Sequence, residues 1–155
     1  MNKYIKIILL ILVIWWMAIV FCFSHQQSVE SSATSFGFIE TILNIVGGDN
    51  MDTSTKLELI QNLQSPIRTL AHFTIYFIGG VIIYFFFSTT KYTEKMKIGL
   101  SILLSFAYAV FDECHQYFVP GRVADIADVC IDTLGALAGI MLIVFVTNMI
   151  SKRDV

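Results

Sequence analysis

The 155-residue sequence is poor in charge and cysteine, and each shortage argues against a class of protein. Charged residues make up 14 % of the chain, against roughly 25 % in average soluble proteins. The net charge is only −2 and no Lys/Arg-rich run occurs, so we expect no nucleic-acid partner. The 3 cysteines are widely spaced and form no CxxC motif, which argues against a disulfide framework.

Apolar residues take the place of these groups. They make up 56 % of the chain, and the mean hydropathy is +0.73. A water-soluble fold of this size could not bury so much apolar surface, so we expect the chain to lie in a lipid bilayer. We interpret residues 1–155 as a single membrane domain.

Four apolar windows are long enough to span a bilayer, which takes about 20 residues for about 30 Å of hydrocarbon. The first window resembles a secretory signal because Lys3 and Lys6 precede it, but it ends Val-Phe-Cys-Phe-Ser rather than in small residues. We interpret it as an uncleaved anchor. The predicted fold is therefore all-α, a polytopic membrane protein with transmembrane helices at about residues 4–23, 66–87, 98–118 and 125–147.

Lysine and arginine in the short flanks predict the orientation. Seven of them lie before the first span, between the second and third, or after the fourth: Lys3, Lys6, Lys91, Lys95, Lys97, Lys152 and Arg153. The opposite side carries Lys56, Arg68 and Arg122. We therefore expect both termini to be cytoplasmic, and residues 24–65 to lie outside.

The outer segment 24–65 predicts short interfacial helices. Apolar residues recur at helical spacing until Gly47-Gly48 stops the pattern: Phe36, Ile39, Ile42, Leu43 and Val46. A second short helix is expected from about Thr55, with Glu58 completing a capping box. Ser65-Pro66 then has the pattern of an N-cap and first residue of the second span.

Polar residues gather where the last two spans approach the same predicted face. Residues three and four apart share a helical face, so Asp112, His115 and Gln116 lie together. Asp125, Asp128 and Asp132 form a stripe that Gly135 and Gly139 continue. The glycines permit close approach of another helix, which would direct the aspartates into the bundle. We therefore expect a polar pocket at the outer face, built by spans two, three and four.

Each of these residues also has a purely structural alternative. Asp125 could be the N-cap of the fourth span and Asp128 an acid favoured by the helix dipole. Asp132, one turn deeper, could simply hydrogen-bond to another span. Glu113 and Gln116 could simply be hydrated at an interfacial helix end. His72 could be a core histidine that hydrogen-bonds to a neighbour, and Arg122 could be the counter-ion that neutralises the cluster.

Clustered carboxylates need counter-ions, a metal ion, water or a raised pKa. Glu113, His115 and Asp128 are candidates for a general base, with Arg122 as oxyanion stabiliser. A divalent metal is conceivable as a cofactor, and its candidate ligands are His72, Asp112, His115 and Asp128. No HExxH motif or nucleophile elbow supports an enzyme.

Three stretches resemble the VanZ-like family of membrane proteins: FSHQQSVESS (23–32), AHFTIYFIGG (71–80) and DECHQYFVPGRVADIADVCIDTLGALAG (112–139). Family members often have Asn where Asp132 stands, and Ser near Ala124 or Asp125. Transfer by position adds Ser24 and Gly135, and gives a ligand-binding set of His72, Tyr76, Asp112, Glu113, Gln116, Arg122, Asp125, Asp128 and Asp132.

The resemblance implies a multi-pass protein of the bacterial cytoplasmic membrane and low-level resistance to teicoplanin and related lipid-tailed glycopeptides. Our first hypothesis is a binding protein whose partner is a lipid headgroup, a lipid-linked envelope precursor or a lipoglycopeptide. The second is a membrane-embedded hydrolase or transferase acting on a lipid-linked substrate, with or without a metal. The third is a small proton-coupled transporter, which would need an ionisable group near the midplane.

Overall fold

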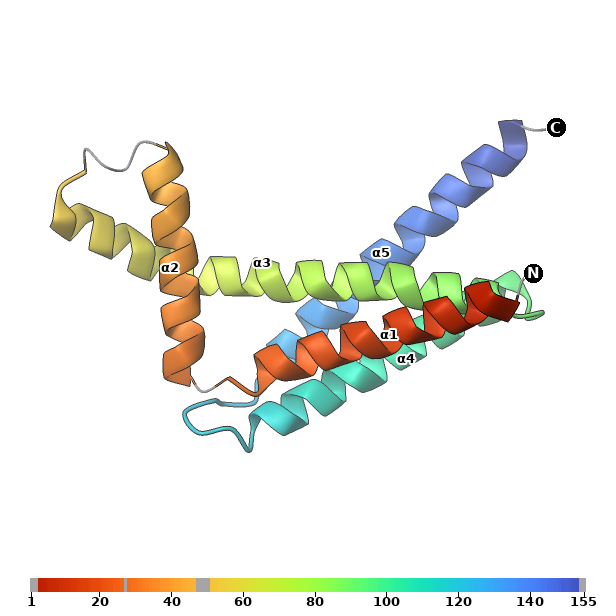
Figure 1. Cartoon of the computed structure of the whole chain (residues 1–155), viewed down its shortest axis with the longest axis horizontal. Helices are drawn as coiled ribbons and strands as arrows, with labels where there is room; N and C mark the ends of the chain where they lie inside the picture. Colours follow the sequence, from red (N-terminus) through yellow and green to blue (C-terminus); the bar gives the residue numbers. More distant parts are fainter. Residues whose placement is uncertain (1–2, 27, 47–50, 154–155) are drawn as a thin grey trace.

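The computed structural model describes residues 3–26, 28–46 and 51–153, and these fold into five α-helices with no strand among them (Figure 1). The all-α prediction is confirmed. In chain order the helices are α1 (Lys3–Ser24), α2 (Ser28–Val46), α3 (Thr53–Ser88), α4 (Glu94–Gln116) and α5 (Ile126–Arg153).

Four of the helices are long and apolar enough to cross a membrane, in agreement with the four predicted windows. They are α1, α3, α4 and the part of α5 from Ile126 to Ile150. The N-terminus lies at the same end of the bundle as the turn between α3 and α4 (Figure 1). This arrangement fits the predicted orientation, although the side of the membrane stays a prediction.

The start of α3 differs from the prediction. Ser65-Pro66 does not begin the helix, because α3 starts at Thr53, with Asp52 as the N-cap accepting the Ser54 N–H at 3.2 Å. Pro66 lies inside the helix and is exposed. A proline removes one backbone hydrogen bond, which a membrane helix can tolerate where other groups or water satisfy the freed carbonyl.

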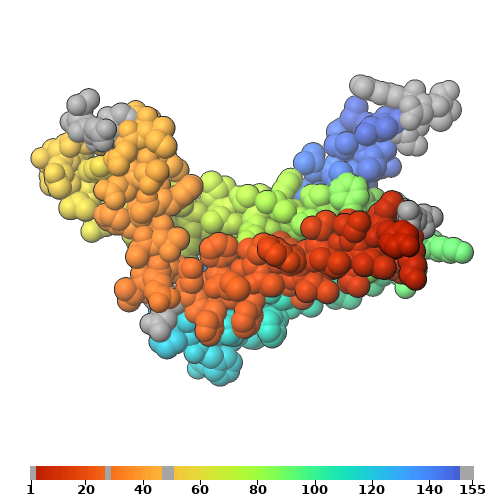
Figure 2. All heavy atoms as spheres, viewed as in Figure 1, coloured from red at the N-terminus to blue at the C-terminus, as the bar shows by residue number. Residues whose placement is uncertain are grey.

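Residues from Thr53 onward therefore form no separate short helix. Thirty-six residues make α3 about 54 Å long at 1.5 Å per residue, well beyond the hydrocarbon thickness. The predicted helix before it is confirmed as α2, while Gly47-Gly48 lie outside the described residues. Lys56 joins the two helices by donating to Asn44 Oδ1 at 2.6 Å. Figure 2 shows α2 projecting from the bundle alongside the start of α3.

Glycines bring α3 and α5 into backbone contact. A Cβ atom on Gly135 would lie 2.4 Å from the Phe73 carbonyl oxygen, and one on Gly139 would lie 2.2 Å from the Phe77 carbonyl oxygen. From the other helix, a Cβ on Gly80 would meet the Ala136 carbonyl oxygen at 2.4 Å. The prediction that the glycine stripe of the fourth span faces another helix is confirmed.

Polar aromatic side chains attach α1 to the other helices. Trp16 Nε1 donates to the Ile75 carbonyl of α3 at 2.9 Å, and the Tyr108 hydroxyl of α4 donates to the Met17 carbonyl at 2.5 Å. The Trp16 ring also packs edge-on against Tyr76, with ring centroids 5.4 Å apart. Hydrogen bonds of this kind supply cohesion where lipid gives apolar helices little reason to associate.

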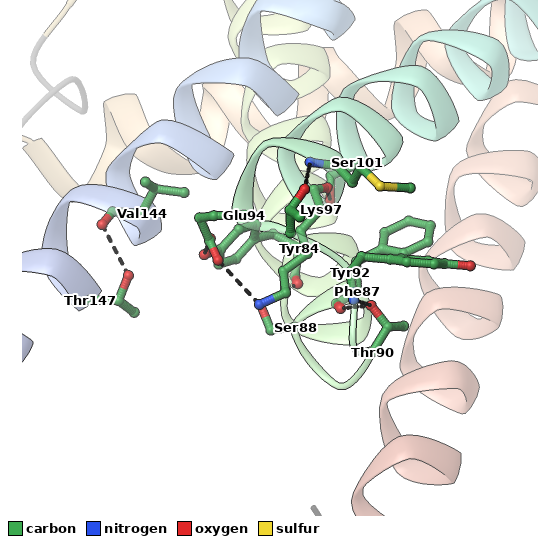
Figure 3. Close-up of polar contacts among 12 residues, drawn as sticks. Tyr84, Phe87, Ser88, Thr90, Tyr92, Glu94, Lys97, Ser101, Val144 and Thr147 are labelled. Atoms are coloured by element: carbon green, nitrogen blue, oxygen red, sulfur yellow. Dashed lines mark hydrogen bonds and ion pairs between the residues drawn. The ribbon is translucent and has the colours of Figure 1, made fainter.

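A second group of polar contacts closes the turn between α3 and α4 (Figure 3). The hydroxyl of Tyr84 donates to Glu94, and Lys97 Nζ lies 3.1 Å from the other carboxylate oxygen of Glu94. Thr93 caps α4 by accepting the Met96 N–H at 3.4 Å. These contacts hold the antiparallel helices α3 and α4 together at the end of the bundle opposite the start of α5.

We expect Gly139→Ala to lower the thermal stability of the purified protein in detergent. The added methyl would meet backbone, which cannot move aside like a side chain, and overpacking of this kind costs about 1–3 kcal/mol. Gly99→Ala is the matched control, because nothing lies within 4 Å of its Cβ position. Equal melting temperatures for both variants would show that the α3–α5 contact is not close.

Candidate functional site

Buried polar side chains gather at the end of the bundle where α1 and α4 finish and α5 begins, which we call the polar end. Figure 1 shows these three helix ends on the same side of the molecule. Five polar residues with relative exposures of 1–5 % lie there: Ser24, Asp112, Glu113, Gln116 and Asp132.

A chain of hydrogen bonds runs along α4 into the following turn. Gln116 Nε2 donates to Asp112 Oδ2 at 3.1 Å, and Arg122 Nη1 donates to Gln116 Oε1, also at 3.1 Å. Gly121 has a φ of 77°, a conformation that favours glycine, and it allows the turn to bring Arg122 back to α4. The predicted shared face of Asp112 and Gln116 is therefore confirmed.

Arg122 also closes the end of α1. Its Nη2 donates to the Phe23 carbonyl at 3.4 Å and its Nε to the Gln26 carbonyl at 3.3 Å. Carbonyls at a helix C-terminus lack partners within the helix, and a cation there is favourable. Burial lowers the pKa of the Arg122 guanidinium, and the positive charge of Arg68 lowers that pKa further.

Asp125 and Glu113 together build the start of α5. Asp125 Oδ1 accepts the Ala127 N–H at 2.8 Å, so the capping alternative for Asp125 is correct. Glu113 Oε1 accepts the Asp125 N–H at 2.5 Å and thereby ties α4 to the same helix start. Asp128 lies in the first turn of α5, where a carboxylate is favoured by the helix dipole.

His72 and Asp132 form a contact between α3 and α5. Their Nδ1 and Oδ1 atoms are 3.3 Å apart, and Asp132 is 1 % exposed. Asp132 lies one turn before Gly135, so the glycine contact holds its carboxylate against α3. The expectation that Asp132 bonds to another span is thus correct.

A cavity of about 540 Å³ opens between the polar end and the helices α2 and α3. Five of the nine residues of the predicted ligand-binding set line it: His72, Tyr76, Asp112, Gln116 and Arg122. Glu113, Asp125, Asp128 and Asp132 do not line it. The structure therefore divides the predicted set into cavity residues, residues at the α4–α5 connection (Glu113, Asp125 and Asp128), and Asp132 in the α3–α5 contact.

Four buried oxygen atoms at the polar end accept or donate no hydrogen bond among the described residues. They are Ser24 Oγ, Tyr76 OH, Asp112 Oδ1 and Glu113 Oε2. A buried polar group without a partner costs about 1–3 kcal/mol. Three of the four residues, all except Glu113, line the cavity, so a polar molecule within it could satisfy them.

The residues predicted for catalysis and for metal binding do not come together in one site. Among the described residues no three His, Cys, Asp or Glu side chains are grouped closely enough to hold a metal ion. His115 contacts His25 and Phe21 rather than His72 or Asp112. Its Nε2 lies 3.4 Å from His25 Nδ1, and its ring stacks on Phe21. No hydrogen bond within the described part of the chain joins any two of Glu113, His115 and Asp128.

Several residues of the site were not found from the sequence. His25 next to His115 was missed, as was the whole wall that α2 contributes: Ser31, Thr34, Ser35 and Phe38. Their spacing of three, one and three residues places them on one helical face, which was an available signal. Arg68, which was expected on the same side of the membrane as Arg122, lines the cavity with it.

The fold and the polar end define a class: a small all-helical, multi-pass membrane protein with ionisable groups buried at one end of its bundle. Within that class, the VanZ/LLP1 family model matches residues 9–147. The chain therefore belongs to the VanZ-like family. No curated protein and no solved structure matches it significantly.

We expect His72→Leu to destabilise the protein, because it leaves the buried Asp132 carboxylate without its partner at a cost of about 1–3 kcal/mol. Adding Asp132→Asn should recover part of the loss, since the amide carries no charge. Thermal unfolding in detergent measures both effects. The control is His25→Leu, because His25 is exposed. If the second change lowers the stability further by its full separate effect, the two side chains are not coupled.

Proposed function

We propose that this protein binds a component of the bacterial cell envelope in a polar pocket at the outer face of the cytoplasmic membrane. Binding would mask that component or limit antibiotic access to it, which gives low-level resistance to teicoplanin and related lipid-tailed glycopeptides. Membership of the VanZ-like family supports teicoplanin as the antibiotic concerned. The distribution of lysine and arginine supports the placing of the pocket at the outer face of the membrane.

One observation carries the proposal: a cavity whose polar wall contains buried, unpartnered groups. Structural roles account for Asp125, as a cap, and for one oxygen of Glu113. They do not account for the unpartnered oxygens Tyr76 OH and Asp112 Oδ1, whose residues are 0 % and 2 % exposed. Groups that are costly to bury without partners are expected where a ligand supplies them.

Binding is favoured over catalysis because, within the described residues, no hydrogen bond joins a nucleophile to any of the three general-base candidates Glu113, His115 and Asp128. The general-base candidates are separated into different contacts, and Glu113 uses one carboxylate oxygen to hold the start of α5. A catalytic base needs hydrogen-bond reach to a nucleophile or to a bound substrate. A hydrolase or transferase reaction therefore has less support from the geometry than recognition has.

The direct test is teicoplanin susceptibility of a sensitive host that expresses the chain. We expect resistance from the parent protein and its loss in His72→Ala, Glu113→Gln, Arg122→Ala and Asp128→Asn, with membrane abundance measured for each. Lys91→Ala, at the exposed α3–α4 turn, is the control and should stay resistant. Resistance that survives all four changes would refute a role for the polar pocket.

Asp112, the carboxylate in the cavity wall, also distinguishes binding from catalysis. Asp112→Glu keeps the charge, so a binding site should retain part of the resistance that Asp112→Ala loses. Catalysis depends on placing a group within a fraction of an ångström, so a catalytic Asp112 would lose activity in both variants. Equal loss in two normally abundant variants would contradict simple binding.

A further inference from the structure

The cavity changes from polar to apolar across its length. Its size of about 540 Å³ falls in the range of about 300–1,000 Å³ that small-molecule sites occupy. Away from the polar end its wall comes from α2 and α3 and carries the apolar side chains Phe38, Ile67, Leu70, Ile75 and Ile78. Hydroxyl-bearing residues also line this part, namely Ser31, Thr34, Ser35 and Thr74, and the hydroxyls of Thr34 and Ser35 donate to carbonyls of α2 itself. Leu70 and Ile78 line the cavity and are still 59 % and 50 % exposed, so it is open toward lipid along α3.

The charges in the cavity wall favour an anion. Arg68 and Arg122 are its permanent cations, and Asp112 is its one carboxylate among the described residues. Arg122 has five N–H donors, and its three hydrogen bonds to protein leave two donors for a ligand. The repulsion between the two arginines contributes to the lowered pKa of Arg122, and an anion between them would relieve it.

The unpartnered groups add a second requirement. The Tyr76 hydroxyl could donate to an oxygen of an anion, and Asp112 Oδ1 is left without a hydrogen bond although the Ser24 hydroxyl lies beside that carboxylate. A head that combines an anion with a hydroxyl or amine would satisfy both Tyr76 and Asp112. A phosphate ester of glycerol or ethanolamine has this combination.

We propose that the cavity binds one phosphate-ester amphiphile, with its head at Arg122, Arg68 and Asp112 and its alkyl chain along α2 and α3. This inference rests on the proposed function and specifies the class of ligand. The open side at Leu70 and Ile78 lets the rest of the chain remain in the bilayer. A sugar head without an anion would leave both arginines unneutralised, and a phosphate without a tail would leave the apolar wall empty.

The test is native mass spectrometry of the full chain in detergent with three probes. Myristoyl-lysophosphatidylethanolamine has head and tail, tetradecyl maltoside has the tail with an uncharged head, and glycerol phosphate has the head alone. We expect one bound molecule of the lysophospholipid, with the other two binding at least about tenfold more weakly. Tenfold is the loss expected from one charge-assisted hydrogen bond.

Two variants test the two ends of the cavity. Arg122→Gln should weaken lysophospholipid binding about tenfold by removing the charged donors. Ala71→Phe should weaken it similarly by filling the apolar part, and as Ala71 is exposed the change should not impair folding. Their controls are Lys91→Gln and Ala107→Phe, which are exposed, lie outside the cavity wall and should bind as the parent does.

Equal binding of the maltoside would overturn recognition of the head. Equal binding of glycerol phosphate, or unchanged binding in Ala71→Phe, would overturn the role of the tail. If no probe binds while the polar-cluster variants still lose teicoplanin resistance, the ligand class is wrong and the proposed function stands. If the lysophospholipid binds as expected in a protein that gives no resistance, the ligand class stands and the proposed function fails.

Discussion

The contact between the backbones of α3 and α5 determines where the polar end can form. Gly135 of α5 lies against the Phe73 carbonyl of α3. His72 precedes Phe73, and Asp132 lies one turn before Gly135, so the same contact places His72 Nδ1 3.3 Å from Asp132 Oδ1. In lipid, apolar side chains give helices little reason to associate, so small residues that allow close packing become decisive. A methyl group on Gly135 would separate the helices and with them the His72–Asp132 pair.

The second organising feature is that α4 buries its polar face. Ser101 and Ser105 are 0 % exposed, while Leu103 and Phe106 are 61 % and 45 % exposed. Both serines donate to carbonyls four residues earlier in α4, so they are satisfied without any other helix. Asp112 on the same face is satisfied within α4 at only one oxygen, Oδ2, which accepts from Gln116. Along the polar face of α4, the serines are therefore satisfied within the helix, whereas Asp112 still needs a hydrogen-bond donor from outside it.

Much of this architecture could be predicted because it depends on local spacing. The four spans follow from window length, and the orientation of Asp132 follows from the glycines on its own stripe. The start of α3 could not be found in the same way, because Pro66 carries a helix-start signal that the helix accommodates instead. The contacts from Arg122 to Phe23 and Gln26 join residues 99 and 96 positions apart, and spacing within one sequence holds no signal for them.

Arg122 connects the architecture of the polar end with the ligand recognition that we propose for it. A planar guanidinium can hold the end of α1 and Gln116 in fixed directions at once, which a lysine ammonium on a flexible stem cannot do as well. The same bonds fix the remaining donors before any ligand arrives. Little side-chain ordering is then required on binding, and such preorganisation strengthens affinity without additional contacts. The structural role of Arg122 is therefore a condition for its proposed role in recognition rather than an alternative to it.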